Sequence, residues 1–251
     1  MIQAVIFDLD GTVLDNEPVW EEAFAAVAAK HKVQSSKFNV QWFHEPGIGI
    51  TPNWKRYFPF DLDKVDKYSR ETWKNYWDNK KEIKIKDGLV ELVEKIKERG
   101  WMTALTTGSS WNVVEKELEE LALYLAFDVT TTGEEVIAQK PDPEIYLLTC
   151  QKLGLEPKEC VVVEDAIAGV RAGVEAGCAV IGLESDYAPK KMLLTAGAKW
   201  AVGDLNEIVD ILRIHGREKR DFYEALEELA NDTTPNEPMG LSEEDRVIYG
   251  G

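Results

Sequence analysis

Two aspartates near the start of the chain could do chemistry together. Asp8 and Asp10 follow directly on the apolar run Ala4–Phe7, and Gly11-Thr12 comes next. A short run of bulky apolar residues is typical of a strand buried on both faces of a parallel sheet, and the glycine lets the chain leave it sharply. Because open α/β sheets bind ligands at the carboxyl ends of their strands, the pair suggests a Mg²⁺ site with an aspartate nucleophile.

A second acidic pair, Glu164 and Asp165, comes immediately after the apolar run Val161–Val163. Two carboxylates at the end of a buried strand are costly unless they bind a cation. The alternative is that Asp165 caps the following helix, which would account for one of the two acids. The pair therefore predicts the other half of a cation site.

Two further residues could handle a phosphoryl group. Thr107, with Gly108 after it, ends a predicted strand, where a hydroxyl and neighbouring main-chain N–H groups can hold a phosphoryl oxygen. Thr106 is the alternative hydroxyl. Lys140 precedes Pro141 and a predicted helix, and its ammonium could neutralise a nucleophile and an incoming phosphoryl group.

Together these residues resemble the four motifs of the haloacid dehalogenase superfamily, which consists mostly of phosphatases and phosphomutases. DLDGT at Asp8–Thr12 resembles the first motif, Thr107 with Gly108 the second, KPDP at Lys140–Pro143 the third, and Glu164 with Asp165 the fourth. The resemblance covers about Ile2 to Ile214. Within the family, DNEPVW at Asp15–Trp20 and EDAIAGVRAG at Glu164–Gly173 are similar to the branch of β-phosphoglucomutases and phosphoglycolate phosphatases.

The resemblance implies a phosphoric monoester hydrolase that acts on a small phosphorylated metabolite, such as a sugar phosphate or phosphoglycolate. In such enzymes the residue at Asp8 attacks phosphorus and forms an aspartyl-phosphate. The residue at Asp10 protonates the leaving group and then activates water. Mg²⁺ on Asp8, Asp165 and the main-chain carbonyl of Asp10, with Glu164 as ligand or neighbour, would offset charge together with Lys140. Dehalogenation is not expected, because dehalogenases work without metal and lack the second aspartate.

Two positions depart from the family pattern. The branch often reads EPLH where this chain has Glu17-Pro18-Val19-Trp20, and the mutases use that histidine to couple substrate recognition to acid/base chemistry. Trp20 therefore favours hydrolysis over the alternative, a β-phosphoglucomutase-like phosphohexomutase. Ala166 stands where serine is common, with a modest expected effect on metal affinity. A non-catalytic binding protein on the same fold is a further alternative, although every expected catalytic and metal-binding residue of the four motifs is present.

Specificity is expected to lie in the segment that follows the first motif. Trp20, Lys55 and Arg56 are the predicted substrate-binding residues there, with Gly108 from the core, and His44 and Asn53 are further candidates. Lys55 and Arg56 would bind a second anionic group on the substrate.

Alternating patterns predict the elements that position these residues. Strands are expected at Met102–Thr106, Phe127–Thr130, Val161–Val163 and Ala179–Leu183, and helices at Leu89–Arg99, Trp111–Leu123, Pro143–Leu153, Ala166–Ala176 and Leu205–Ile214. This alternation predicts an α/β fold with a Rossmann-like parallel sheet and helices on both faces. Residues 17–86 show aromatic residues at helical spacing and no convincing strand, which predicts an inserted α-helical cap.

The expected domains are a catalytic core at residues 1–16 and 87–214, the cap at 17–86, and a C-terminal helix with a mobile acidic tail at 215–251. In the cap, Trp42-Phe43 and the loop Glu45–Pro52 could face the cleft, although a plain connector is at least as compatible with that loop's composition.

Composition excludes several classes of partner. The formal net charge is −17, from 46 acidic against 29 basic residues, and such a surface repels nucleic acid and anionic membranes. The three cysteines lack metal-ligand spacing, which favours reduced thiols in a cytoplasmic protein. No signal peptide is expected, because the sequence begins directly with a predicted strand, and no apolar run is long enough to cross a bilayer. A monomer is expected, because no apolar surface stripe is evident.

Overall fold

The computed structural model describes residues 1–33 and 44–214. The expectations for Trp42-Phe43 and for the C-terminal helix and tail at 215–251 lie outside these residues. None of the described helices is both long enough and apolar enough to cross a membrane.

The core is a six-stranded, all-parallel sheet in the order β5-β4-β1-β6-β7-β8. Its strands are β1 (Ala4–Asp8), β4 (Met102–Thr107), β5 (Val129–Thr132), β6 (Cys160–Glu164), β7 (Ala179–Leu183) and β8 (Trp200–Val202). After β1, the strands β4 and β5 add on one side of it, and the strands β6, β7 and β8 then add on the other side. This reversal of strand order lies beside β1, where doubly wound sheets bind their ligands.

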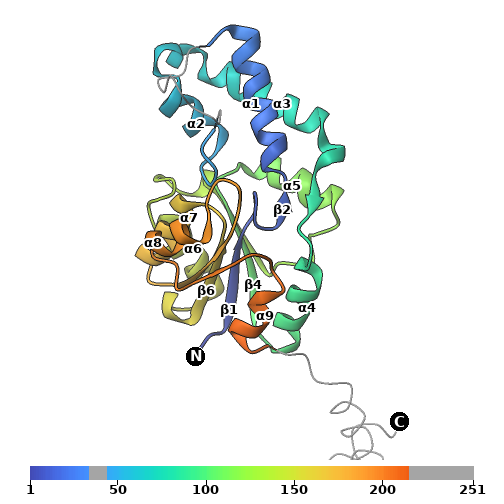
Figure 1. Ribbon diagram of the computed structural model, residues 1–251, viewed down its shortest axis with the longest axis vertical. Coiled ribbons are helices and arrows are strands. Elements are labelled where there is room, and N and C mark those ends of the chain that lie inside the picture. The colour runs from blue at the N-terminus through green and yellow to red at the C-terminus, as the bar shows by residue number, and fades with distance from the viewer. Residues whose placement is uncertain (34–43, 215–251) are drawn as a thin grey trace, which may run out of the picture. The chain divides into compact units, whose positions relative to one another are not determined.

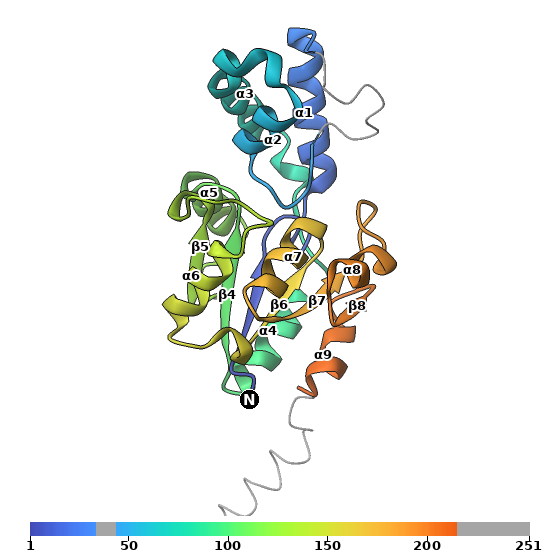
Figure 2. The same ribbon diagram turned by 90° about the vertical axis from the view of Figure 1, so that its left-hand side faces the viewer.

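Helices cover both faces of the sheet (Figures 1 and 2), which confirms the predicted fold class. They are α4 (Leu89–Glu98), α5 (Trp111–Glu120), α6 (Glu144–Leu153), α7 (Ile167–Glu175), α8 (Lys190–Ala196) and α9 (Glu207–Leu212). Alternate residues of β1 enter opposite hydrophobic clusters: Val5 and Phe7 pack with α4, α5 and α9, and Ala4 and Ile6 with α6, α7 and α8. Every residue of β1 is buried, so its apolar run is continuous rather than alternating.

A helical insertion lies between β1 and β4. It comprises α1 (Glu17–His31), α2 (Ile50–Tyr57) and α3 (Val65–Asp78), with 3₁₀ turns at Pro59–Lys64 and Lys80–Glu82. Trp20, Phe24 and Val27 of α1 are buried, in line with the helical spacing expected for this segment. Phe24 and Tyr68 both pack against the ring of the fully buried Trp54, so aromatic side chains form the centre of the insertion.

The two chain connections between the insertion and the core run side by side. Leu14–Asp15 (β2) pairs antiparallel with Lys84–Ile85 (β3), a short strand inside the segment that was expected to have none. The sequence prediction is wrong here because a two-residue strand carries no periodic pattern. This pairing fixes the start of α1 close to the end of β1. The boundaries of the insertion at residues 17 and 86 stay a prediction.

Three core elements also differ from expectation. β5 begins two residues later than predicted, because Phe127 packs into the core while the Asp128 carboxylate accepts from the main-chain N–H of Thr103 at 2.8 Å. α8 and β8 were missed, since each is short and β8 is the edge strand. The remaining predicted core elements are present, with ends within three residues of those expected.

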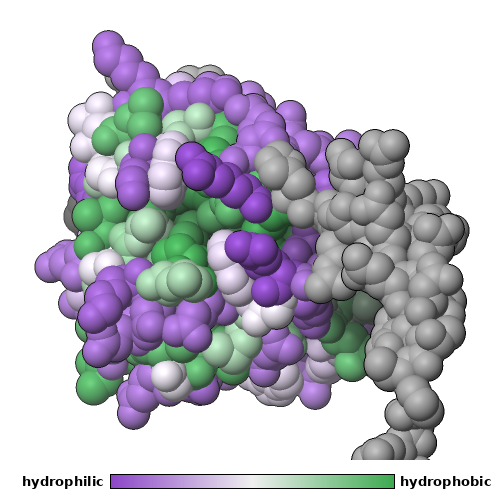
Figure 3. Space-filling view, turned by 90° about the horizontal axis from the view of Figure 1, so that it is seen from below, coloured by the Kyte–Doolittle hydropathy of each residue, from purple (hydrophilic) through white to green (hydrophobic). Residues whose placement is uncertain are grey.

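The surface carries no simple apolar stripe in the view of Figure 3, where hydrophobic residues are interspersed with hydrophilic ones. The exposed large apolar side chains are spread over several helices, among them Val90 on α4, Leu147 on α6 and Leu194 on α8. The expected monomer stays a prediction. Cys150, Cys160 and Cys178 are buried free thiols.

Candidate active site

The candidate active site lies at the carboxyl ends of the three central strands. Asp8 is the last residue of β1, Thr107 of β4 and Glu164 of β6. Asp8 pairs in register with Thr106, and Phe7 with Val163, so Asp8 and Glu164 lie level on neighbouring strands. Residues that are up to 156 positions apart in the sequence meet at this edge because parallel strands all end there.

Lys140 lies between two of these carboxylates and is 3 % exposed. Its Nζ donates to Asp8 Oδ1 at 2.5 Å and to Glu164 Oε1 at 2.6 Å. Burial opposes the charged ammonium, but the attraction of Asp8 and Glu164 outweighs it and raises the pKa of Lys140. The positive charge of Lys140 is therefore held at the carboxylate of Asp8.

Asp8, Glu164 and Asp165 form a buried acidic cluster in which each offers an oxygen within 4.8 Å of the others. Burial and then the nearby Glu164 raise the pKa of Asp8, and burial followed by Glu17, Asp8 and Glu164 raises that of Asp165. A single ammonium therefore does not offset the negative charge here. An ionised Asp8 needs further positive charge beyond Lys140.

The unshared oxygens show where a cation fits. Asp8 Oδ2 and Asp165 Oδ2 are buried and have no hydrogen-bond partner among the described residues. By contrast, Glu164 Oε1 accepts from Lys140 and from Tyr146 OH at 2.6 Å, and Oε2 accepts from the Ala166 N–H at 3.2 Å. Hard carboxylate oxygens are the ligands that Mg²⁺ prefers. The donor set suits Mg²⁺, with Asp8 and Asp165 better placed as direct ligands than Glu164.

The capping alternative for Asp165 is wrong. α7 begins at Ile167, its N-cap is Ala166, and no side-chain cap bond is made there. Instead Thr12 Oγ1 donates to Asp165 Oδ1 at 3.2 Å. Gly11 also approaches this carboxylate, because a Cβ at its φ of +78° would lie 2.2 Å from Asp165 Oδ2. The glycine of the first motif is thus required both by its backbone conformation and by the space that Asp165 occupies.

Asp10 faces the same region and is held by donors on both carboxylate oxygens. Oδ1 accepts from Asn16 Nδ2 and from Trp20 Nε1, both at 2.7 Å. Oδ2 has longer contacts, 3.5 Å to Thr107 Oγ1 and 3.4 Å to Ser109 Oγ. Burial and then Glu17 raise the pKa of Asp10, which favours a carboxyl group able to donate a proton.

The structure separates Thr107 from its neighbour Thr106. Thr107 Oγ1 points toward Asp10 and also accepts from the Ser109 N–H at 3.0 Å. Thr106 Oγ1 is 2.9 Å from Thr149 Oγ1 on α6, which packs on one face of the sheet. Successive side chains of a strand point to opposite faces, so the residue that ends β4 turns toward the site.

A hydrogen-bonded chain that sequence reasoning missed runs from Asp10 into the interior. Asn16 Nδ2 donates to Asp10 and to Tyr76 OH at 2.8 Å, and Tyr76 OH donates to Glu117 Oε1 at 2.5 Å. Tyr76 belongs to the insertion and Glu117 to core helix α5. The Trp20 ring stacks on Tyr76 at 3.6 Å and an interplanar angle of 11°. Nothing in the local sequence sets Glu117 apart from the other glutamates of α5.

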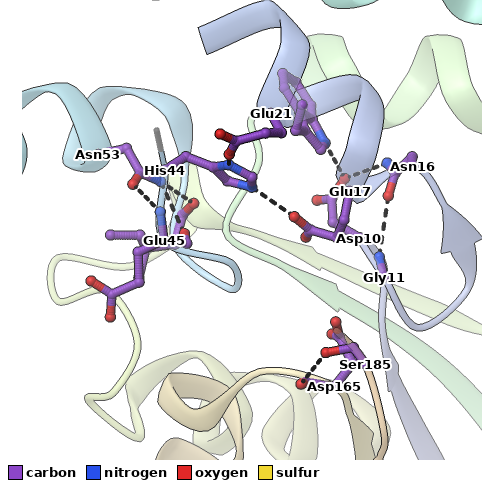
Figure 4. Close-up of polar contacts among 12 residues, drawn as sticks. Asp10, Gly11, Asn16, Glu17, Glu21, His44, Glu45, Asn53, Asp165 and Ser185 are labelled. Atoms are coloured by element: carbon purple, nitrogen blue, oxygen red, sulfur yellow. Dashed lines mark hydrogen bonds and ion pairs between the residues drawn. The ribbon is translucent and has the colours of Figure 1, made fainter. Parts of the chain in front are cut away.

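A pocket above Asp8 and Asp10 takes most of its wall from the insertion. Its lining consists of Asp8, Asp10, Glu17, Trp20, Phe24, His44, Pro46, Gly47, Ile48, Gly49, Ile50, Gly108 and Ser109. The predicted Trp20 and Gly108 are in this wall, as is part of the loop that follows His44. Figure 4 shows His44, in the loop before α2, and Glu17, at the start of α1, close to Asp10, which follows β1.

Two predicted substrate-binding residues do not reach this pocket. Lys55 is exposed, and Arg56 donates to Glu45 Oε2 at 2.7 Å with 48 % of its side chain exposed. Neither is among the described residues that line the pocket. Both lie on α2, whose buried residues are Asn53 and Trp54. Asn53 fixes the loop by accepting from the Glu45 N–H at 2.6 Å, so it acts on the loop's conformation rather than lining the pocket.

Comparison with known proteins gives the class that this fold and site define. Residues 2–177 match the haloacid dehalogenase-like hydrolases. A phosphorylated carbohydrates phosphatase of Thermotoga maritima is 32 % identical over 220 residues, covering 84 % of this chain and 99 % of that protein. Hexitol phosphatase A of Escherichia coli is 34 % identical over 182 residues, covering 72 % of this chain and 82 % of that protein.

Structural similarity leads to the same group. The crystal structure of CbbY from Rhodobacter sphaeroides in complex with phosphate superposes with a TM-score of 0.68 at 25 % identity, covering 83 % of this chain and 96 % of that one. The chain belongs to the haloacid dehalogenase-like hydrolase family. Within that family it is a phosphatase, a phosphoric monoester hydrolase.

Proposed function

We propose that this protein is a Mg²⁺-dependent phosphatase that hydrolyses phosphorylated sugars or sugar alcohols through an aspartyl-phosphate. The observation that carries the proposal is the arrangement around Asp8: Lys140 holds Oδ1 at 2.5 Å, while Oδ2 is buried without a partner among the described residues. The substrates for which the relatives from Thermotoga maritima and Escherichia coli are named, phosphorylated carbohydrates and hexitol phosphates, support the substrate class.

In the proposed reaction, an Asp8 carboxylate oxygen forms a bond to phosphorus as the bond between phosphorus and the ester oxygen breaks. Asp10 gives its proton to the departing alkoxide. Asp10 then takes a proton from water, whose oxygen attacks phosphorus, releases inorganic phosphate and restores Asp8. Lys140, Thr107 and the main-chain N–H groups after it offset the charge of the transferring group.

Mg²⁺, held by Asp8, Asp165 and the main-chain carbonyl of Asp10 with Glu164 beside it, would supply additional positive charge at the phosphoryl group. The insertion at residues 17–86 is proposed to act as the cap that limits the access of bulk water to the pocket.

Trp20 favours hydrolysis over the mutase alternative. Its indole N–H donates to Asp10 at 2.7 Å, and indole has neither an acceptor nor a titratable group with which to relay a proton. A histidine at this position could do both.

The test is phosphorus NMR of the protein with Mg²⁺ and glucitol 6-phosphate, fructose 1-phosphate or β-glucose 1-phosphate. Wild type is expected to release inorganic phosphate, Asp8→Asn to release none while remaining folded, and Asp15→Asn, a substitution at an exposed carboxylate, to behave as wild type. Substantial turnover by Asp8→Asn would remove the covalent mechanism. Conversion of glucose 1-phosphate to glucose 6-phosphate without free phosphate would establish the mutase instead.

A further inference from the structure

The insertion's side of the pocket carries a cluster of charged groups that the phosphoryl chemistry does not use. His44 Nε2 is 2.6 Å from Glu17 Oε2, and its Nδ1 is 2.9 Å from Glu21 Oε2 (Figure 4). The imidazole also stacks on Phe24, with ring centroids 5.3 Å apart and planes 4° from parallel. Glu17, His44 and Phe24 all line the pocket, while Glu21 holds the imidazole from behind.

The geometry defines the charge of this cluster. Each imidazole nitrogen faces a carboxylate oxygen, and ionised carboxylates only accept hydrogen bonds, so both nitrogens carry a proton. Burial opposes this charged form, but Glu17 and then Glu21 outweigh it and raise the pKa of His44 to about 9. The described contacts of His44 thus bring two carboxylates against one imidazolium.

The charged side chains in the described part of the pocket wall are acidic apart from His44. Among the described residues that line the pocket, none is lysine or arginine, and Asp10 adds a further acid. The adjoining, more open cleft contains Arg70 and Lys116, but Glu115 and Glu134 line it too and balance them. Lys116 also lies over the ring of Trp73, 5.7 Å from its centroid. The described side chains that line these two clefts, where the part of the substrate beyond its phosphate would lie, therefore carry no net positive charge.

We propose that the wall formed by Glu17, Glu21 and His44 selects monophosphates whose carbon chain carries hydroxyl groups and no second anion. This inference rests on the proposed function and narrows its substrate class. Carboxylates accept hydrogen bonds from hydroxyl groups, and the apolar side chains of Trp20, Phe24 and Ile48 line the pocket where the carbon skeleton of a polyol would pack. A carboxylate or a second phosphate in the same space would be repelled by the wall without finding a cation to pair with.

The proposal separates this protein from a structural neighbour. A CbbY variant of Rhodobacter sphaeroides, 25 % identical with a TM-score of 0.66, has been crystallised with a bisphosphate, xylulose-(1,5)bisphosphate. Here the residues first expected to bind a second anion, Lys55 and Arg56, lie outside the pocket wall. Bisphosphates and phosphoglycolate are therefore expected to be poor substrates.

The experiment compares two substrates that differ only in charge at the far end. Glucitol 6-phosphate and gluconate 6-phosphate have the same carbon chain and hydroxyl configuration, but the latter carries a carboxylate in place of a CH₂OH group. Wild-type kcat/KM is expected to be at least about tenfold higher for glucitol 6-phosphate, because like charges in a poorly solvated pocket repel strongly. Equal kcat/KM for the two substrates would overturn the proposal without any variant being made.

Variants then locate the source of the selectivity. Glu17→Gln removes one negative charge from the wall, and Glu22→Gln removes the same charge from the exposed side of α1. The ratio of the two kcat/KM values is expected to narrow by at least about threefold in Glu17→Gln or Glu21→Gln and to stay at the wild-type value in Glu22→Gln. Equal effects of all three would mean that overall charge, not this wall, decides selectivity. Failure to hydrolyse either substrate or p-nitrophenyl phosphate would instead overturn the proposed function, and this inference with it.

Discussion

Asp165→Asn is expected to have opposite effects on the metal-free and the Mg²⁺-bound protein. Asparagine keeps the shape of the side chain and an oxygen that can accept from Thr12, but it removes one charge from the buried cluster of Asp8, Glu164 and Asp165. Without metal, the substitution removes repulsion and should stabilise the fold. With Mg²⁺, it removes a ligand whose Oδ2 has no described protein partner, and should abolish most of the stabilisation that the ion provides.

The magnitude follows from the spacing of the carboxylates. Ligand oxygens within 4.8 Å repel by at least about 3.5 kcal/mol per ionised pair at an effective dielectric constant of about 20. Burial, Glu17 and Asp8 raise the pKa of Asp165, which favours its protonated form in the metal-free protein and reduces the repulsion below that figure. We expect a gain of about 1–3 kcal/mol, which corresponds to about 2–4 °C in Tm for each kcal/mol in a chain of this size.

The same reasoning gives a pH dependence. Since the folded-state pKa of Asp165 is raised above its unfolded value, its contribution to stability is present at low pH and is lost as pH rises through the folded pKa. Metal-free wild type should therefore lose stability as pH rises above the usual aspartate range, and Asp165→Asn should lose less. Saturating Mg²⁺ should make wild type the more stable of the two proteins. At a Mg²⁺ concentration a hundred times its Kd, binding adds about 2.7 kcal/mol to the unfolding free energy of the wild type.

The assay is thermal unfolding of both proteins in chelator and in Mg²⁺ across this pH range. Asp186→Asn is the matched control, since Asp186 is an exposed carboxylate in the same loop region as Ser185, whose Oγ contacts the main chain of Asp165. If Asp165→Asn unfolds at a lower temperature than wild type in chelator, repulsion among the carboxylates does not control the stability of the metal-free protein. If Mg²⁺ raises both Tm values equally, Asp165 is not a ligand.

Two further predictions concern the residues around the pocket. Tyr76→Phe removes the hydroxyl that links Asn16 to Glu117 and should lower kcat about tenfold with KM little changed, the cost of about one hydrogen bond. Glu117→Gln should stay within about twofold of the wild-type kcat, because burial and Asp10 raise the pKa of Glu117 and favour its neutral form. Steady-state kinetics of both variants test this, and a larger loss of kcat in Glu117→Gln would contradict the neutral form. Separately, the His44 pKa of about 9 lies above the unfolded value of 6.5, so its contribution to stability is complete below pH 6.5 and is lost as pH rises through about 9. Wild type should lose about 3 kcal/mol of unfolding free energy between pH 6.5 and about 9, as measured by urea titration at the two pH values. The unfolding free energy of His44→Gln should change little between them. Equal losses in the two proteins would show that His44 is not the titrating group.

The sequence alone determined the core and its strand-end chemistry. Asp8, Thr107 and Glu164 could be placed together without coordinates, because buried parallel strands have a continuous apolar signature and all deliver their last residues to one edge. Lys140 lies in a loop, and only the resemblance of KPDP to the third family motif placed it with them. The insertion between β1 and β4 was predicted because residues 17–86 show aromatic residues at helical spacing and no convincing strand pattern. Elements without such a signature, β2, β3, α8 and β8, were missed because two to seven residues are too few to show a period.

Only the tertiary structure decided how the pocket is built. The hydrogen-bonded chain from Asp10 to Glu117 passes through Asn16 and Tyr76 and so joins segments far apart in the sequence. The pairing of His44 with Glu17 and Glu21 likewise joins a loop to α1. Lys55 and Arg56 have the right chemistry for anion binding but are not among the described residues that line the pocket. Local patterns report which face of an element is apolar, whereas the partner of a polar group depends on how separate elements pack. That packing is set by side-chain shape across long sequence separations, which no local pattern encodes.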